Sequence, residues 1–171
     1  MGKDSGGGLH EFVTGRYPDM RRSAFLMCGD WSVADELTRW SLAHLVAEHR
    51  RGEIDDPDAY AYAQLMAAFQ HRPARREHVF VAASDPEGAG PDTRGPHDGA
   101  DQIRTVLLLD ALHELTPRCR AVMVLRHFNG FAVDETADVL GLTDKRVEAY
   151  EAAGLAALER LLVDSGSGGG R

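Results

Sequence analysis

Cysteine is scarce in this chain of 171 residues, in which Cys28 and Cys119 are the only two. One possible pair does not make a disulfide framework, and the separation of the two cysteines matches no metal-ligand spacing. The eight histidines are scattered, and none forms a His-x-x-x-His pair beside a carboxylate base, so the sequence indicates no metal site. Because both cysteines lie within apolar helical patterns, we expect buried free thiols rather than a redox switch.

Long apolar runs are also lacking, since no stretch approaches the roughly 18–20 residues that a membrane span needs. The opening residues, MGKDSGGGLHEF, hold no apolar core of the kind that a signal peptide has. We therefore expect a cytoplasmic protein. Aromatic residues make up 7% of the chain and hydrophobic residues 43%, and leucine, alanine and valine dominate the latter, which favours an all-α fold.

Basic residues are outnumbered by acidic ones, and the formal net charge is -8. A free-standing DNA-binding protein usually has a basic surface, so this charge argues mildly against one, whereas a protein docked on a larger DNA-binding machine can tolerate it. The sequence contains no nucleophile–base pair, phosphate-binding loop or metal constellation. We therefore expect neither an enzyme nor a cofactor.

Three helices are predicted in the N-terminal half. The first covers residues 9–28, with Pro18 either beginning or kinking it, and the second covers residues 33–49, with Ser32 as its N-cap. The third starts at Pro57 and ends near residue 72. The inward face predicted for the second helix consists of Leu37, Trp40, Ala43 or His44, and Ala47. The third helix is followed by a basic cluster of three arginines, Arg72, Arg75 and Arg76. This cluster either binds phosphates or forms a solvated helix end.

Residues 79–103 are rich in glycine, proline and aspartate, and they carry one arginine against five acidic residues. This composition predicts a flexible acidic linker. It divides the chain into an N-terminal helical domain (9–78) and a C-terminal helical domain (104–163).

The C-terminal half has the pattern of a helix-turn-helix module. An apolar helix over residues 102–115 precedes a helix that ends near Asn129-Gly130, and a third helix carries apolar residues at i, i+4 and i+7 up to Leu140. Gly141 then supplies a tight turn before the last helix. The residues at the start of that helix would meet base edges in the major groove, and they are Thr143, Asp144, Lys145, Arg146 and Ala149. An ordinary helical hairpin would show the same spacing.

Residues 115–147 also carry a series of short motifs in one register: Leu-x-Pro-Arg-x-Arg, then Val-x-x-Leu-Arg, then an acidic helix and a Leu-Gly turn. The residues that carry the pattern are Leu115, Pro117, Arg118, Arg120, Val122, Leu125, Arg126, Glu135, Ala137, Leu140, Gly141 and Val147. This stretch resembles the C-terminal domain of an extracytoplasmic-function RNA polymerase sigma factor of the actinobacterial, sigma-E-like type. The resemblance implies a domain that binds the −35 promoter element and in which Arg118 and Arg120 also contact DNA.

The N-terminal half resembles the same family through two segments, residues 26–30 and 56–60. The resemblance implies a domain that docks on core RNA polymerase and melts the −10 promoter element. It assigns polymerase contacts to Asp35, Glu36 and Arg39, and DNA contacts to the three arginines of the basic cluster.

Two helices depart from the family pattern, and they motivate a second hypothesis. Arg39-Trp40 replaces a Gln-Glu pair in the docking helix, and Glu148 and Tyr150 stand where the recognition helix usually has lysine and arginine. The first hypothesis is a sigma factor that directs polymerase to specific promoters. The alternative is a degenerate sigma-like regulatory protein that acts through protein–protein contacts without binding promoters itself. An anti-sigma factor or another regulatory protein is a further candidate partner.

Overall fold

Helices account for all the regular secondary structure in the part of the chain that the computed structural model describes, residues 5–52, 54–71 and 99–167. In chain order they are α1 (Ser5–Cys28), α2 (Trp31–Arg51), α3 (Pro57–His71), α4 (Gly99–Glu114), α5 (Pro117–Met123), the π-helical turn η1 (Val124–Phe128), α6 (Val133–Leu140) and α7 (Asp144–Ser167). The predicted all-α fold is therefore confirmed. Three helices begin earlier than predicted, α1 at Ser5, α2 at Trp31 and α4 at Gly99, and α1 runs through Pro18.

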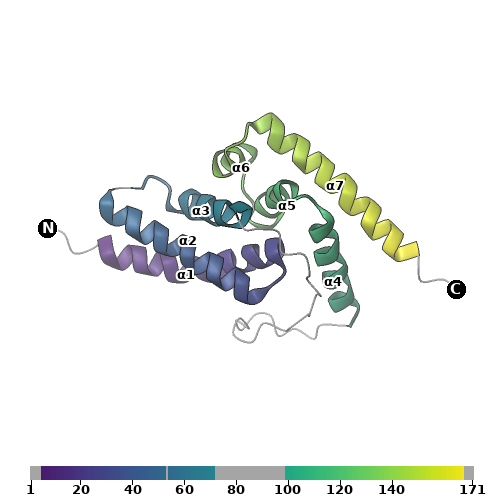
Figure 1. Ribbon diagram of the computed structural model, residues 1–171, viewed down its shortest axis with the longest axis horizontal. Coiled ribbons are helices and arrows are strands. Elements are labelled where there is room, and N and C mark those ends of the chain that lie inside the picture. The colour runs from purple at the N-terminus through teal and green to yellow at the C-terminus, as the bar shows by residue number, and fades with distance from the viewer. Residues whose placement is uncertain (1–4, 53, 72–98, 168–171) are drawn as a thin grey trace.

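The first three helices lie side by side in one group, and α5, α6 and α7 form a second group with α4 beside α7 (Figure 1). One apolar core joins the two groups. The N-terminal helices contribute large buried side chains such as Met20, Leu45 and Leu65, and the C-terminal group contributes Val124 and Leu125. The two halves of the chain thus bury part of their apolar surface against each other.

The second helix begins at a cap that differs from the predicted one. The Asp30 carboxylate accepts hydrogen bonds from the backbone amides of Ser32, at 2.8 Å, and Val33, at 3.0 Å. Asp30 therefore satisfies the amides that have no partner within the helix, and Ser32 lies inside the first turn. The prediction of Ser32 as N-cap was wrong because a stronger acceptor stands two residues earlier.

The inward face of α2 is also rotated from the predicted one. Leu37 is buried as predicted, but Trp40 is 43% exposed, and Ala43, His44 and Ala47 are exposed as well. The buried set instead includes Thr38 and Ser41, whose hydroxyls donate to backbone carbonyls four residues earlier, each at 2.8 Å. This local bond satisfies the hydroxyl inside the apolar core. Polar residues such as Thr38 and Ser41 can therefore belong to the buried face, which the predicted face did not include.

The helix-turn-helix is formed by α6, Gly141 and α7. Gly141 has φ 62° and ψ 41°, the left-handed conformation that favours glycine, and the Leu142 amide donates to the Ala137 carbonyl at 2.9 Å to close the turn. Val122, Ala137 and Val147 form a buried cluster between α5, α6 and α7. The angle between the last two helices is therefore fixed by a glycine turn and a small apolar core.

Gly154 marks the closest approach of α7 to α5. A Cβ atom at this position would lie 2.6 Å from the Met123 Sδ and 3.1 Å from the Cys119 Sγ. Both side chains are buried, so neither can move away freely. The absence of a side chain at Gly154 therefore allows α7 to pack closely against α5.

We expect Gly154→Ala to lower the free energy of unfolding by about 1–2 kcal/mol, because overpacking outweighs the gain of about 1 kcal/mol in helix propensity. Gly15→Ala in α1 is the matched control, since a Cβ there would meet no atom within 4 Å. The control should be neutral or stabilising in the same chemical denaturation experiment. Stabilisation by both substitutions would contradict the close contact.

Candidate nucleic-acid and polymerase interfaces

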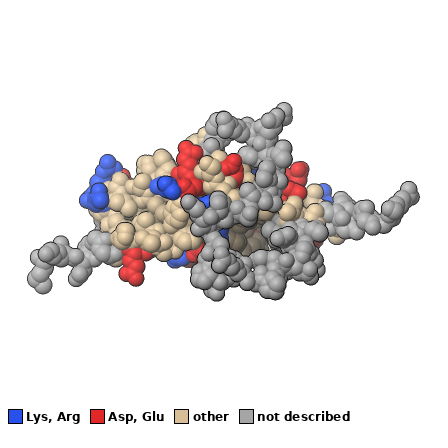
Figure 2. All heavy atoms as spheres, turned by 90° about the horizontal axis from the view of Figure 1, so that it is seen from below, with Lys and Arg blue, Asp and Glu red and all other residues tan. Residues whose placement is uncertain are grey.

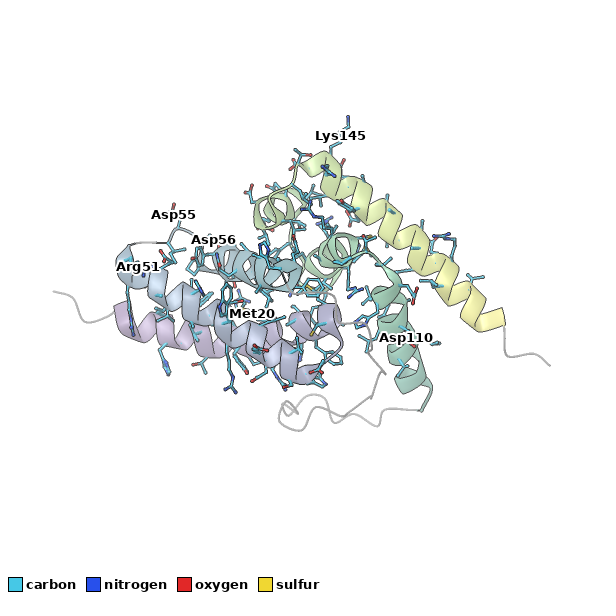
Figure 3. All side chains as sticks on the ribbon, viewed as in Figure 1. Met20, Arg51, Asp55, Asp56, Asp110 and Lys145 are labelled. Atoms are coloured by element: carbon cyan, nitrogen blue, oxygen red, sulfur yellow. The ribbon has the colours of Figure 1, made fainter. Side chains whose placement is uncertain are left out.

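The first turn of α7 lies at an outer end of the molecule. Figure 3 shows Lys145 projecting from this end, away from the other helices. The Thr143 carbonyl accepts the first hydrogen bonds of the helix, from the Arg146 amide at 2.9 Å and the Val147 amide at 3.0 Å. Val147 is fully buried and anchors the turn. The five residues of the predicted recognition surface are all exposed around it: Thr143, Asp144, Lys145, Arg146 and Ala149.

Acidic side chains surround the two basic residues of this surface, Lys145 and Arg146. Asp144 and Glu148 are exposed on α7, and Asp134, Glu135 and Asp138 are exposed on α6. Acidic groups repel the phosphates that basic groups attract, so the local charge favours a contact confined to the first turn of α7. On the face shown in Figure 2, the basic and acidic side chains of the described residues lie in small separate groups.

Glu151, the next acidic residue along α7, binds side chains of η1 and does not add to this acidic surface. Its side chain is only 16% exposed and lies between Arg126, whose Nε is 3.3 Å from Oε2, and His127, whose Nε2 is 2.9 Å from Oε1. Arg126 also donates to the Phe131 carbonyl. This cluster ties α7 to η1 and orients the recognition helix, a role that charge counting along the sequence could not reveal.

The two arginines at the start of the C-terminal group have different environments. Arg118 is exposed in the first turn of α5, where a phosphate could reach it. Arg120 turns inward and donates to backbone carbonyls of three residues near the end of α4, those of Leu112 at 2.8 Å, His113 at 2.7 Å and Leu115 at 3.0 Å. It also donates to the Met27 carbonyl near the end of α1.

Arg120 therefore does not present its guanidinium to DNA in this structure, which corrects the DNA contact predicted for it. All its nitrogens bond carbonyls at the ends of two helices, where the last carbonyls have no partner within their own helix. Burial lowers the pKa of Arg120 from its ordinary value, which is so high that the group still carries its charge at neutral pH. The side chain joins α1, α4 and α5.

The predicted polymerase contacts lie along α2. Asp35 is bound mainly inside the protein, by Arg39 with Nε 2.8 Å from Oδ2, by Arg21, and by the Tyr17 hydroxyl. Burial and the Asp35 carboxylate together raise the pKa of Tyr17, so this phenol remains a hydrogen-bond donor at neutral pH. Glu36 and Arg39 are exposed on α2, and the Arg39 Nε also lies 3.4 Å from the Tyr17 hydroxyl of α1.

An aromatic pair extends this exposed side of α2. The rings of Trp40 and His44 lie 4.0 Å apart between centroids, and both residues are exposed. Trp40 was predicted to lie on the inward face of this helix, and the structure exposes it. The remaining predicted DNA contacts, Arg72, Arg75 and Arg76, lie outside the described residues.

Within the described ranges, no three His, Cys, Asp or Glu side chains gather as a metal site would require. None of the helices described here is long and apolar enough to cross a membrane. Cys28 and Cys119 are buried free thiols, as predicted.

The geometry described above defines a helix-turn-helix protein whose recognition helix projects its first turn into solvent.

Comparison with known proteins places this helix-turn-helix in a family. Residues 105–158, from within α4 to within α7, match the family model of sigma-70, region 4. The chain is 31% identical over 159 residues to the RNA polymerase sigma-E factor of Streptomyces coelicolor, covering 91% of this chain and 86% of that protein. It is 28% identical over 135 residues to the extracytoplasmic-function sigma factor SigD of Mycobacterium tuberculosis, covering 78% of this chain and 63% of SigD.

The chain belongs to the family of extracytoplasmic-function RNA polymerase sigma factors, as its motifs predicted. Sigma factors direct RNA polymerase in transcription initiation, binding the core enzyme and promoter DNA, and as a family they are not enzymes. This membership gives the chain a role in transcription initiation.

Proposed function

We propose that this chain binds core RNA polymerase in the cytoplasm and reads the −35 promoter element with the first turn of α7. The observation that carries the proposal is the exposure of Lys145 and Arg146 on a helix whose buried side is fixed by Val147. Each predicted domain has its own function in this proposal. Residues 9–78 bind the polymerase and the −10 element, residues 104–163 bind the −35 element, and residues 79–103 connect the two domains.

Each residue of the recognition surface has a chemistry suited to a base edge or a phosphate. Lys145 and Arg146 can donate to the O6 and N7 acceptors of guanine, and Ala149 can contact a thymine methyl group. Asp144 can accept from the amino group of cytosine, and the Thr143 hydroxyl suits a phosphate oxygen. Arg118, exposed on α5, supplies a further phosphate contact.

The surface of this chain that docks on polymerase is the exposed side of α2, and its charged members are Glu36 and Arg39. Asp35 supports this surface from beneath through its ion pair with Arg39. Arg72, Arg75 and Arg76 follow α3 in the chain, and we assign them phosphate contacts near the −10 element.

A sigma-like regulator without promoter binding is the second candidate function. The exposed acidic residues of α6 and α7 favour it, because they repel DNA close to the recognition surface. In that case the exposed sides of α2 and α7 would bind proteins, an anti-sigma factor among them.

Binding by the full chain and bacterial core polymerase separates the two candidates. The complex should co-sediment and should bind promoter fragments more tightly than core polymerase alone, with an affinity that falls as salt rises. A complex that forms but gains no DNA affinity would identify the regulator instead. Failure of the chain to bind core polymerase would overturn the proposal.

A further inference from the structure

Glu148 is an exposed acidic residue that begins the second turn of α7, directly beside the proposed recognition surface. Its carboxylate has no hydrogen-bond or ion-pair partner among the residues that the structure describes. Glu151, three residues later, differs in this respect, because Arg126 and His127 bind its carboxylate. The charge of Glu148 therefore supports no ion pair with another described residue, and its side chain is available to a ligand.

The neighbours of Glu148 on the surface of α7 suit a close approach of DNA bases. Lys145 lies three residues before it and Ala152 four residues after it, and residues at these separations are adjacent on a helix. Lys145, Ala149 and Ala152 are exposed at i, i+4 and i+7 of one outward face. Val147 is buried on the opposite side. Because both alanines are short, the side chains of Lys145 and Glu148 can extend past them into a groove.

A carboxylate selects one kind of base edge in the major groove. It only accepts hydrogen bonds, and the cytosine edge presents an amino donor, whereas the guanine and thymine edges present acceptors. Adenine also has an amino group, but the N7 acceptor beside it repels a carboxylate. The helix rises about 1.5 Å per residue, so Glu148 lies about 4.5 Å along α7 from Lys145, on the order of one base-pair step.

We propose that Glu148 determines promoter specificity by accepting a hydrogen bond from a cytosine amino group in the −35 element. This inference rests on the proposed function and names one base that the recognition surface reads, next to the base that Lys145 contacts. Repulsion between Glu148 and phosphates lowers the affinity for every sequence, and the bond to cytosine offsets that loss only at matching promoters. The acidic residue therefore increases the discrimination between promoters while it weakens non-specific binding.

Two substitutions at Glu148 have different expected results. Glu148→Ala removes the acceptor and should reduce the preference for cytosine at one position of the −35 element about 5- to 150-fold. Glu148→Gln supplies a donor beside an acceptor, so the preference at that position should change from cytosine to adenine. Glu159→Ala is the matched control, because Glu159 is exposed on the same helix but about 16 Å further along it.

Selection from a pool of DNA fragments with a randomised −35 region measures these preferences. The full chain with bacterial core polymerase binds the pool, and sequencing of the bound fragments gives the base frequencies at each position. The unaltered and Glu159→Ala chains should enrich the same cytosine, and Glu148→Ala should lose that enrichment and keep those at other positions. Unchanged base frequencies with Glu148→Ala would overturn the proposal, even if all fragments bound more tightly, because Glu148 would then only repel phosphates.

A cytosine analogue tests the hydrogen bond itself. The analogue lacks the exocyclic amino group and replaces the selected cytosine in one synthetic promoter. It should weaken binding by the unaltered chain more than binding by Glu148→Ala, by the same factor of about 5- to 150-fold. Equal weakening with both chains would show that Glu148 does not bond this amino group, and would overturn the proposal.

Stability and polymerase binding separate this inference from the proposed function. Glu148→Ala should unfold at the same denaturant concentration as Glu159→Ala, because neither carboxylate binds another described residue. Unfolding of Glu148→Ala alone at a lower concentration would assign Glu148 a structural role and overturn the proposal. A selected −35 sequence that does not depend on Glu148 would contradict this inference alone. An unaltered chain that binds polymerase but enriches no −35 sequence would contradict the proposed function, and this inference with it.

Discussion

Arg120→Met should lower the free energy of unfolding by about 3 kcal/mol, the larger of the two stability effects expected here. The substitution leaves the carbonyls of Met27, Leu112, His113 and Leu115 without their donor. Each unsatisfied buried acceptor costs about 1–3 kcal/mol, and relief from burying a charge offsets part of that sum. Chemical denaturation of the full chain measures the change.

Arg118→Met is the control. Arg118 lies two residues before Arg120 and is exposed, so this substitution removes the same charge without disturbing the interior. It should change the free energy of unfolding by no more than about 0.5 kcal/mol. Equal stabilities of the two variants would contradict the interior position of Arg120. A selective loss of DNA affinity in the Arg120 variant, with normal stability, would restore the role suggested by its motif.

Lys145→Glu combined with Arg146→Glu should abolish promoter-specific transcription and leave polymerase binding intact. Each lost base contact costs about 1–3 kcal/mol, so two of them reduce promoter affinity by a factor on the order of 100 or more. The added carboxylates would also repel phosphates. Polymerase binding should survive, because both residues lie on α7 and the proposed docking surface lies on α2.

Arg160→Glu provides the matched control, since Arg160 is exposed on the same helix but several turns from its first turn. Transcription by this variant should remain near the unaltered level. Unchanged transcription by the double variant would remove α7 from promoter recognition. Loss of polymerase binding by the double variant would mean that α7 also contacts the enzyme.

The features that the sequence predicted correctly are those set by neighbouring residues. The left-handed turn falls at Gly141, because few residues other than glycine adopt that conformation. The i, i+4, i+7 spacing of Val133, Ala137 and Leu140 matches the observed helix α6. Pro57 begins α3 as predicted, with the Asp56 carboxylate accepting the Ala59 amide at 2.9 Å. Local stereochemistry was sufficient for these features.

The features that it missed depend on partners far away in the chain. Arg120 was itself predicted to contact DNA, and its bond to the Met27 carbonyl, which comes from a distant part of the chain, holds it inward. Asn129 was interpreted as a helix stop, and its bonds to Ser23 and Tyr62 require the packed tertiary structure. Trp40 was predicted inward as a member of one helical face, although its exposure depends on which side of α2 meets α1 and α3.

The central claim is that this chain directs polymerase to particular promoters, and mapped transcription start sites test it most directly. Core bacterial polymerase with the full chain should transcribe a pool of genomic fragments from discrete sites, each preceded by a shared sequence at the −35 position. Core polymerase alone should not use those sites, and the Lys145→Glu, Arg146→Glu chain should lose them. Start sites identical with and without the chain, despite stable binding to polymerase, would contradict the account.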